Sequence, residues 1–267
     1  MILSRRFLRV AALAAVFALG LAGTALADSK KWVGPTGGDW KEGTNWNPNG
    51  VPAAADEVLI SGAEVKITEA ANAKSVELGQ GATLSIEGAG KLTLAAGGAL
   101  HASGDATVEV KAADGLAFTT ATNIAVNPDK ALTLKRKAPG NIKGAGSLTL
   151  SGGGTLNVNL PLTTATGLEI KDGSTLNVVD ALPDLAGTVK VTKGNLMLNR
   201  GLADTVNKIT VTDGVLTLAE GVKIGKDAPL DGEVDLKDKG QLVLGRDLTL
   251  KELTTAEVAR SRPTARP

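Results

Sequence analysis

Residues 76–100 read VELGQGATLSIEGAGKLTLAAGGAL, and the spacing of their apolar residues decides the fold. The stretch opens a series of apolar residues at steps of eight. The series consists of Val76, Leu84, Leu92, Leu100, Val108, Leu116, Ile124 and Leu132. A fixed period of this kind is typical of proteins built from stacked repeats.

Each position in the series begins a short apolar-x-apolar unit, as in Leu84-Ser85-Ile86 and Leu92-Thr93-Leu94. In a β-strand the first and third side chains share one face and the middle one points to the other. The units therefore predict strands with apolar side chains inside and Ser, Thr or Glu outside. Three such strands would make one coil of about 24 residues.

After a break at residues 135–141 the rhythm changes, and two series advance together. Leading strands are expected near Leu148, Leu168, Val189, Ile209 and Val234, and following strands near Leu156, Leu176, Leu196, Leu216 and Leu242. The steps are 20, 21, 20 and 25 in the first series, and 20, 20, 20 and 26 in the second. Two registers that advance together predict a solenoid with one coil every 20 to 26 residues. Leu160-Pro161-Leu162 or Val222-Lys223-Ile224 would supply a weaker third strand.

The alternative is a pair of antiparallel sandwich domains. The Asp-Gly pairs at Asp114, Asp172, Asp213 and Asp231 would suit hairpin turns. We favour the solenoid because sandwiches do not usually keep one register over so many strands.

Composition limits the classes of function. The chain has no Cys and no Tyr, and Phe118 is its only Phe beyond residue 27. Disulfides are therefore unavailable, and stability must come from core packing and backbone hydrogen bonds. Without the three arginines of the first 27 residues the net charge changes from +1 to −2. This balance does not favour a nucleic acid or an acidic membrane as partner.

Residues 1–27 have the features of a bacterial signal peptide. Arg5, Arg6 and Arg9 form a basic region, an apolar Ala/Leu-rich run follows, and Ala25-Leu26-Ala27 is a small-x-small cleavage site before Asp28. The segment SRRFLR resembles a twin-arginine export signal, and general secretion is the alternative route. We expect an exported protein, extracellular or at the cell surface, with the periplasm as a further location.

Residues 144–159, GAGSLTLSGGGTLNVN, carry a second kind of signal. They resemble the autotransporter-associated β-strand repeat, whose form is G-x-G-x-L-x-x-x-G-x-G-T-L-x-[LV]. Residues 173–178, GSTLNV, resemble a further unit of the same family. The resemblance implies a single-stranded right-handed parallel β-helix of the kind found in autotransporter passenger domains. It does not extend to a C-terminal outer-membrane barrel, because the chain ends in an Arg/Pro-rich segment.

All three tryptophans lie near the start of the expected mature chain. The segments around Trp32, Trp40 and Trp46, with Pro52 and Asp56 after them, resemble a leader that precedes β-helices in large bacterial surface proteins. Its form is W-x-G…G-x-W…N-W-x-x-G-x-P-x-x-x-D-x-V-x-I. We expect a Trp-rich N-terminal cap over the first coil, and a sugar-stacking surface on the same rings is the alternative.

The predicted organisation is all-β. It comprises a signal peptide over 1–27, the cap over 28–60, the β-solenoid over 61–253, and a C-terminal cap or disordered tail over 254–267. Residues 254–260 would form one or two helical turns over the last coil. An uncovered end would expose unpaired strand edges and favour association.

The residues for chemistry are few. His101 is the only histidine and occupies an outward position, and the Asp-Gly pairs suit turns. We therefore expect no catalytic residue, no cofactor and no metal site. The function expected is a non-enzymatic extracellular or cell-surface scaffold, structural or adhesive. Its partner would be itself, by end-to-end or edge association, a surface glycan or another surface protein.

The alternative is a carbohydrate-active β-helix enzyme, a polysaccharide lyase or glycoside hydrolase. It predicts carboxylates and a Lys or Arg that converge beside a long loop, and residues 135–143 form the one stretch suited to that loop. Ice binding would need a flat array of Thr, whereas the outward positions mix Thr, Ser, Glu, Asn, Lys and Met197.

Overall fold

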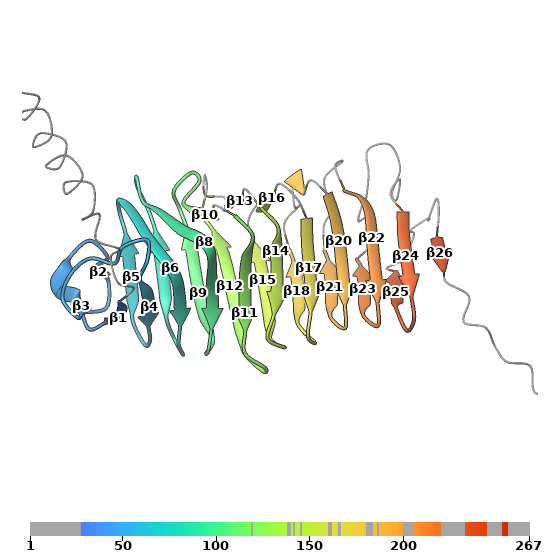
Figure 1. Ribbon diagram of the computed structural model, residues 1–267, viewed down its shortest axis with the longest axis horizontal. Coiled ribbons are helices and arrows are strands. Elements are labelled where there is room, and N and C mark those ends of the chain that lie inside the picture. Colours follow the sequence, from blue (N-terminus) through green and yellow to red (C-terminus); the bar gives the residue numbers. More distant parts are fainter. Residues whose placement is uncertain are drawn as a thin grey trace, which may run out of the picture.

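The apolar-x-apolar units form strands that stack in parallel along one axis, and the chain is a parallel β-solenoid (Figure 1). The computed structural model describes residues 28–118, 120–137, 140, 142–144, 146–159, 162–164, 167–179, 184–185, 187–199, 206–219, 233–244 and 253–255. The expected signal peptide lies outside the described residues.

Each coil presents up to three faces. The strands of face A are β4 (Glu57–Ile60), the C-terminal parts of β6 (Ala70–Leu78) and β8 (Lys91–Ala102), β11 (Thr122–Val126), β14 (Leu148–Ser151), β17 (Gly167–Lys171), β20 (Gly187–Thr192), β22 (Val206–Thr212), β24 (Glu233–Lys237) and β26 (Leu253–Thr255).

Face B is a 10-stranded sheet that follows the same axis. Its strands are β2 (Gly38–Asp39), β5 (Glu64–Ile67), β7 (Thr83–Ile86), β9 (Ala106–Val110), β12 (Ala131–Arg136), β15 (Thr155–Asn159), β18 (Thr175–Val178), β21 (Asn195–Leu198), β23 (Val215–Leu218) and β25 (Gln241–Leu244).

Face C is shorter. It starts with the N-terminal parts of β6 and β8 and continues through β10 (Leu116–Phe118), β13 (Ile142–Gly144), β16 (Leu162–Thr164) and β19 (Asp184–Leu185). The expected third strand of the later coils is thus found at β16, beginning at Leu162. Residues 160–161 and 222–224 lie outside the described residues.

The pairing confirms the expected registers. Leu148, Leu168, Val189, Ile209 and Val234 are successive partners on face A, and Leu156, Leu176, Leu196, Leu216 and Leu242 are successive partners on face B. Before the break, Val76, Leu100 and Ile124 align on face A, and Leu92 and Leu116 align on face C. The period of eight therefore arises from three strands per coil.

Two expectations about the break are corrected. Val108 pairs with Leu134 and not with Leu132, so the period of eight ends at Ile124, one strand earlier than the sequence pattern indicates. The break also does not begin at Lys135, because β12 continues through Arg136 and the backbone N–H of Lys137 donates to the carbonyl of Val110. We call this junction, residues 132–142, the seam.

The core is a set of aliphatic ladders between the faces. Leu84, Leu100, Leu132, Leu156 and Leu216 are all fully buried. Each such side chain stabilises the fold by about 1.5–3 kcal/mol relative to exposure, and it packs on the coils above and below. If a strand shifted its pairing by one residue, its inward aliphatic side chains would all point to water. This cost explains why the register is kept.

The antiparallel sandwich is wrong, because the strands of all three faces pair in parallel and β1 with β3 is the one antiparallel pair among the described strands. Asp114, Asp172 and Asp213 take positive φ of 51°, 57° and 52° and turn the chain between faces. Asp is among the residues that tolerate this left-handed conformation. Asp231 lies outside the described residues.

The N-terminal segment contains β1 (Ser29–Trp32), β2, the 3-10 helix η1 (Gly43–Asn45) and β3 (Trp46–Asn47). β1 pairs in parallel with β4, so the stack already begins within residues 28–60. At the other end β26 pairs with β24. Its residues Thr254 and Thr255 are therefore in a strand and not in the expected helical turns.

Candidate functional site

The three tryptophans pack edge to face at the N-terminal end of the stack. The ring centroids of Trp32 and Trp46 are 4.9 Å apart with an interplanar angle of 81°, and those of Trp40 and Trp46 are 4.8 Å apart at 68°. Trp46 Nε1 donates to the carbonyl of Trp40 at 2.8 Å. The residues are 6, 2 and 2% exposed, in sequence order. Rings buried to this extent offer no open face for stacking on a sugar.

The other residues of the leader pattern hold this cluster in place. Asp56 is buried and accepts hydrogen bonds from the backbone N–H groups of Asp28, at 3.0 Å, and Ala53, at 2.8 Å. Asn45 Nδ2 donates to the carbonyl of Asp39 at 3.1 Å. A side chain at Gly34 would collide with Asn45, which explains the glycine there. Asn45 and Asp56 thus hold the backbone on either side of Trp46.

Carboxylates and a lysine converge on face B just before the seam. Lys111 Nζ donates to Ser85 Oγ at 2.9 Å and to Glu87 Oε2 at 3.1 Å, and it lies 3.1 Å from Glu109 Oε2. Lys137 Nζ is 3.5 Å from the other oxygen of Glu109. This is the arrangement that the enzyme alternative predicts, and sequence reasoning did not identify its members.

The ion pairs of this cluster favour the charged forms of its side chains. Burial disfavours the charge on Lys111, but hydrogen bonds to Glu87 and Glu109 outweigh it and raise the pKa of Lys111 above its ordinary value. Burial likewise disfavours the charge on Glu109, but Lys111 and Lys137 outweigh it and lower the pKa of Glu109. A catalytic lysine base needs a lowered pKa and a catalytic acid a raised one. Both shifts here have the opposite sign, as expected for a structural ion-pair network.

His101 lies at the predicted outward position on face A, with 34% of its side chain exposed. Its Nε2 is 2.9 Å from Asn127 Oδ1 and its Nδ1 is 3.9 Å from Glu77 Oε2. No group of three or more His, Cys, Asp and Glu residues that could hold a metal ion is found in the described part of the chain. Among the same residues no helix is long and apolar enough to cross a membrane.

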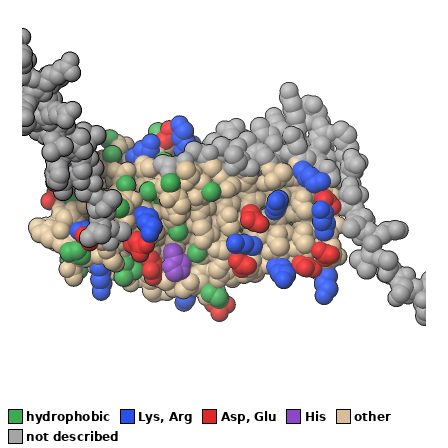
Figure 2. Space-filling view, in the orientation of Figure 1, with side chains coloured by type: hydrophobic (Ala, Val, Ile, Leu, Met, Phe, Trp, Pro, Cys, Tyr) green, Lys and Arg blue, Asp and Glu red, His purple; other side chains and the backbone are tan. Residues whose placement is uncertain are grey.

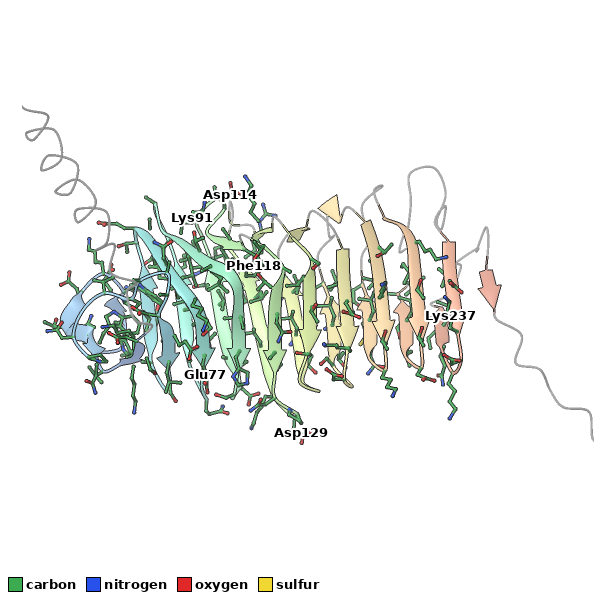
Figure 3. All side chains as sticks on the ribbon, in the orientation of Figure 1. Glu77, Lys91, Asp114, Phe118, Asp129 and Lys237 are labelled. Carbon is green, nitrogen blue, oxygen red and sulfur yellow. The ribbon has the colours of Figure 1, made fainter. Side chains whose placement is uncertain are left out.

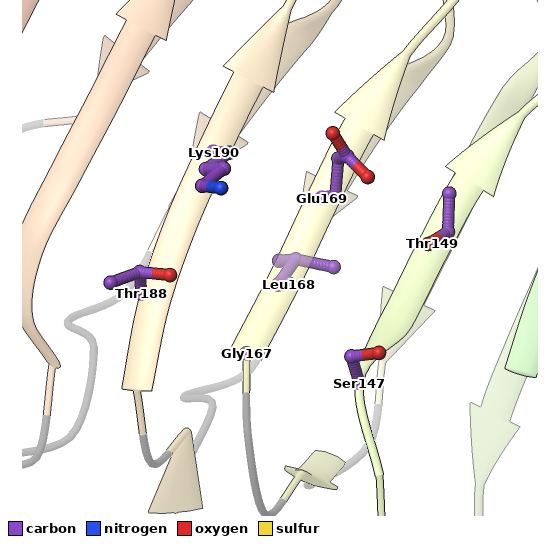
Figure 4. A pocket seen from close by; sticks show the side chains of 7 residues that line it. All are labelled: Ser147, Thr149, Gly167, Leu168, Glu169, Thr188 and Lys190. Atoms are coloured by element: carbon purple, nitrogen blue, oxygen red, sulfur yellow. The ribbon is translucent and has the colours of Figure 1, made fainter. Parts of the chain in front are cut away.

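A shallow depression of about 200 Å³ lies on face A (Figure 4). Ser147, Thr149, Glu169, Thr188 and Lys190 line it, and it lies where Gly167 lacks a side chain beside Thr188. Pockets for small-molecule ligands usually hold about 300–1,000 Å³. The depression is therefore a gap in a row of side chains, smaller than a usual small-molecule pocket.

Face B changes character at the seam. Up to the end of β12, the outward residues include Glu109, Lys111 and Lys135, whereas after the seam every described outward side chain of the face-B strands is uncharged. We call this surface the uncharged face. It consists of Thr155, Asn157, Asn159, Thr175, Asn177, Val179, Asn195, Met197, Asn199, Val215, Thr217, Gln241 and Val243.

Face A of the same coils is charged. Figure 2 shows acidic and basic side chains gathered over this end of the stack, and Figure 3 places Lys237 there, pointing outward. Asp235 is 3.5 Å from Lys208 and 3.4 Å from Lys237. Among the described residues of the later coils, face A therefore carries charged side chains and the uncharged face carries none. The outward Glu and Lys residues that the sequence mixes with Thr and Asn thus lie on face A in the later coils, together with Thr149, Thr188 and Thr210.

Comparison with known proteins gives one match. Residues 31–138 are similar to a family model described as a domain of unknown function, DUF8693. The match begins at the Trp cluster and ends within the seam. No curated protein and no solved structure matches the chain. The family similarity therefore covers the coils before the seam, and the uncharged face lies beyond it.

Proposed function

We propose that this protein is an exported, non-enzymatic scaffold that works outside the cytoplasm as a structural or adhesive element. The observation that carries the proposal is the continuity of the ladders from β4 to β24, with inward aliphatic side chains and mostly polar outward ones. A stack of this kind supplies a long, regular surface and leaves no interior for a substrate. The signal-peptide pattern of residues 1–27 supports export.

The Trp cluster suits such a scaffold because an open end of a parallel stack exposes unpaired backbone groups. The buried rings of Trp32, Trp40 and Trp46 lie at that end, before the first complete coil. We infer that they act as a cap and hold the first strands in place. The cap would favour rods of limited length over continued edge-to-edge growth at this end.

The enzyme alternative has its best candidate at Lys111, with Glu87 and Glu109 beside it. The test is a turnover screen of the purified protein on uronate-containing and neutral polysaccharides, read as released reducing ends and as unsaturated uronate products. The scaffold proposal expects no turnover above a buffer blank. Turnover that is lost in Lys111→Met, with the fold intact by circular dichroism, would establish the enzyme and end the scaffold proposal.

Adhesion is tested separately with the same preparation. The purified protein is added to bacterial cells and to insoluble polysaccharides, and the bound fraction is measured after washing. Retention on either supports the adhesive form of the scaffold. A protein that stays in the wash at all concentrations removes adhesion and leaves the structural form.

A further inference from the structure

We propose that the uncharged face is a self-association surface, on which a second copy of this chain packs face to face around a two-fold axis. The inference rests on the proposed scaffold function and names its partner. It differs from the end-to-end and edge contacts that the sequence suggests, because it uses the outward side of a sheet and leaves the ends of the stack free.

The first argument is the cost of removing water from this surface. Burying a charge without a partner is costly, and the uncharged face has no charge to bury. Its amides already bond to one another along the stack: Asn177 Nδ2 donates to Asn157 Oδ1 at 3.1 Å, and Asn199 Nδ2 donates to Asn177 Oδ1 at 2.7 Å. A polar group that keeps its hydrogen bond loses little when a dry surface covers it.

The second argument is where exposed apolar side chains occur. Five large hydrophobic residues are exposed in the described part of the chain: Val33, Val51, Val179, Met197 and Val243. The last three belong to the uncharged face, where they are 39, 38 and 46% exposed. Charged residues at the turns border this face, among them Asp172, Lys193 and Asp213. Met197 lies on β21, the middle strand of the face, while Val179 follows the end of β18 and Val243 lies on the last strand, β25, so a partner that covers the face would bury apolar surface at its centre and at its margins.

The third argument identifies the partner. The side-chain rows repeat at the spacing of parallel strands, about 4.8 Å, over the length of the face. A partner that interlocks with every row must carry the same spacing, and a second copy has it by construction. Two identical uncharged faces also meet without repulsion, and the face carries no aromatic side chain on which a sugar could stack. A two-fold axis that lies in the plane of the interface, above β21, would bring Met197 against its own copy.

The size of the face predicts a weak pair. Five strands about 4.8 Å apart, with about five residues of 3.3 Å each, cover roughly 400 Å² per copy. Stable complexes bury about 800 Å² per partner. We therefore expect a weak dimer that forms only at high protein concentration, and not a permanent one.

The experiment is sedimentation equilibrium of the purified protein from about 10 µM to 1 mM. The parent should shift from the mass of one chain toward two. Thr217→Lys on the uncharged face should stay monomeric, while its matched control Thr210→Lys on face A should associate like the parent. Because the contact has no charge, raising the salt concentration should not weaken the association. Circular dichroism and thermal melting confirm that each variant is folded.

Two variants with opposite charges at one position distinguish a specific contact between the faces from a general loss of association. Met197→Lys and Met197→Glu should each be monomeric alone and should associate when mixed, at least tenfold more tightly than either does with itself. A parent that is monomeric at 1 mM, an unaffected Thr217→Lys, or loss of association in Thr210→Lys would each overturn the inference. A monomer that is instead retained on a neutral polysaccharide would overturn it in favour of a glycan. The scaffold proposal is tested by export and by the absence of turnover. None of the outcomes above bears on either of these, so the two proposals can fail separately.

Discussion

Asn199 donates from Nδ2 to Oδ1 of Asn177 over 2.7 Å, although the two residues are 22 positions apart in the sequence. Asn177 in turn donates to Asn157 at 3.1 Å. Consecutive coils thus share a chain of side-chain hydrogen bonds that runs along the stack, on the outside of the aliphatic ladders. We call this chain of hydrogen bonds the outer ladder. It holds the strands of face B in register, in addition to the packing of the aliphatic side chains.

Asn177→Asp tests the outer ladder. A carboxylate cannot donate to Asn157, so we expect a loss of about 1–2 kcal/mol in the free energy of unfolding at neutral pH. The deficit relative to the parent should shrink as the pH falls through the ordinary Asp pKa of about 3.9, where the side chain regains a donor. Urea unfolding at several pH values measures both effects. Asn72→Asp, at an exposed position of β6, is the control, and an equal loss there would contradict the account.

Lys111→Met tests the ion-pair network before the seam. Glu87 and Glu109 would lose their shared cation, and we expect a loss of about 1–3 kcal/mol at pH 7. The pKa of Glu109 is lowered from its ordinary 4.5, so its stabilisation is present above that pH and is lost as the pH falls through the folded-state value. The parent should therefore lose more stability on acidification than the variant does. Lys135→Met, an exposed neighbour in β12, should change stability by no more than about 0.5 kcal/mol.

Trp46→Ala tests the cap. This ring lies between the other two and is 2% exposed, so its removal should cost about 3–5 kcal/mol. The chain has three Trp and no Tyr, so its intrinsic fluorescence reports the cap segment alone. We expect a red-shifted emission and a lower melting temperature by the same signal. Val33→Ala, at a position 56% exposed, should leave both unchanged, and a Trp46→Ala variant with the parent's emission would refute the packed cap.

The register at the seam is testable because the chain has no cysteine of its own. Thr107 and Thr133 are Cα partners on neighbouring strands of face B. Cysteines placed at these two positions should form a disulfide under mild oxidation, measurable by mass after proteolysis. Cysteines at Thr107 and Ala131, which the unbroken period of eight would make partners, should not, since that pair is displaced by two residues. Crosslinking of the second pair instead of the first would show that the period of eight continues unbroken to Leu132, and it would contradict the register described above.

Much of the fold could be predicted from the sequence, since inward residues such as Leu156 and Leu176 repeat their spacing directly. The pairing of Val108 with Leu134 could not, because Leu132 and Leu134 both point inward and either satisfies the ladder. Local alternation does not distinguish two registers that differ by two residues.

The candidate surfaces were harder to predict. Alternation tells which side chains face out but not which strands share a face, so Glu169 and Asn177 look alike in sequence. Their positions on different faces, Glu169 on face A and Asn177 on face B, become clear only when the order of strands within each coil is known. The same holds for Lys111 and Glu87, which are 24 positions apart and meet only through the stacking of coils.

The most direct test of the central claim is the location and N-terminus of the chain in the cells that make it. We predict that a C-terminally tagged chain is found outside the cytoplasm, is cleaved by protease added to intact cells or to their medium, and begins at Asp28 on N-terminal sequencing. A version without residues 1–27 should stay inside and be protected. A full-length chain that keeps residues 1–27 and remains in the cytoplasm would contradict an exported scaffold.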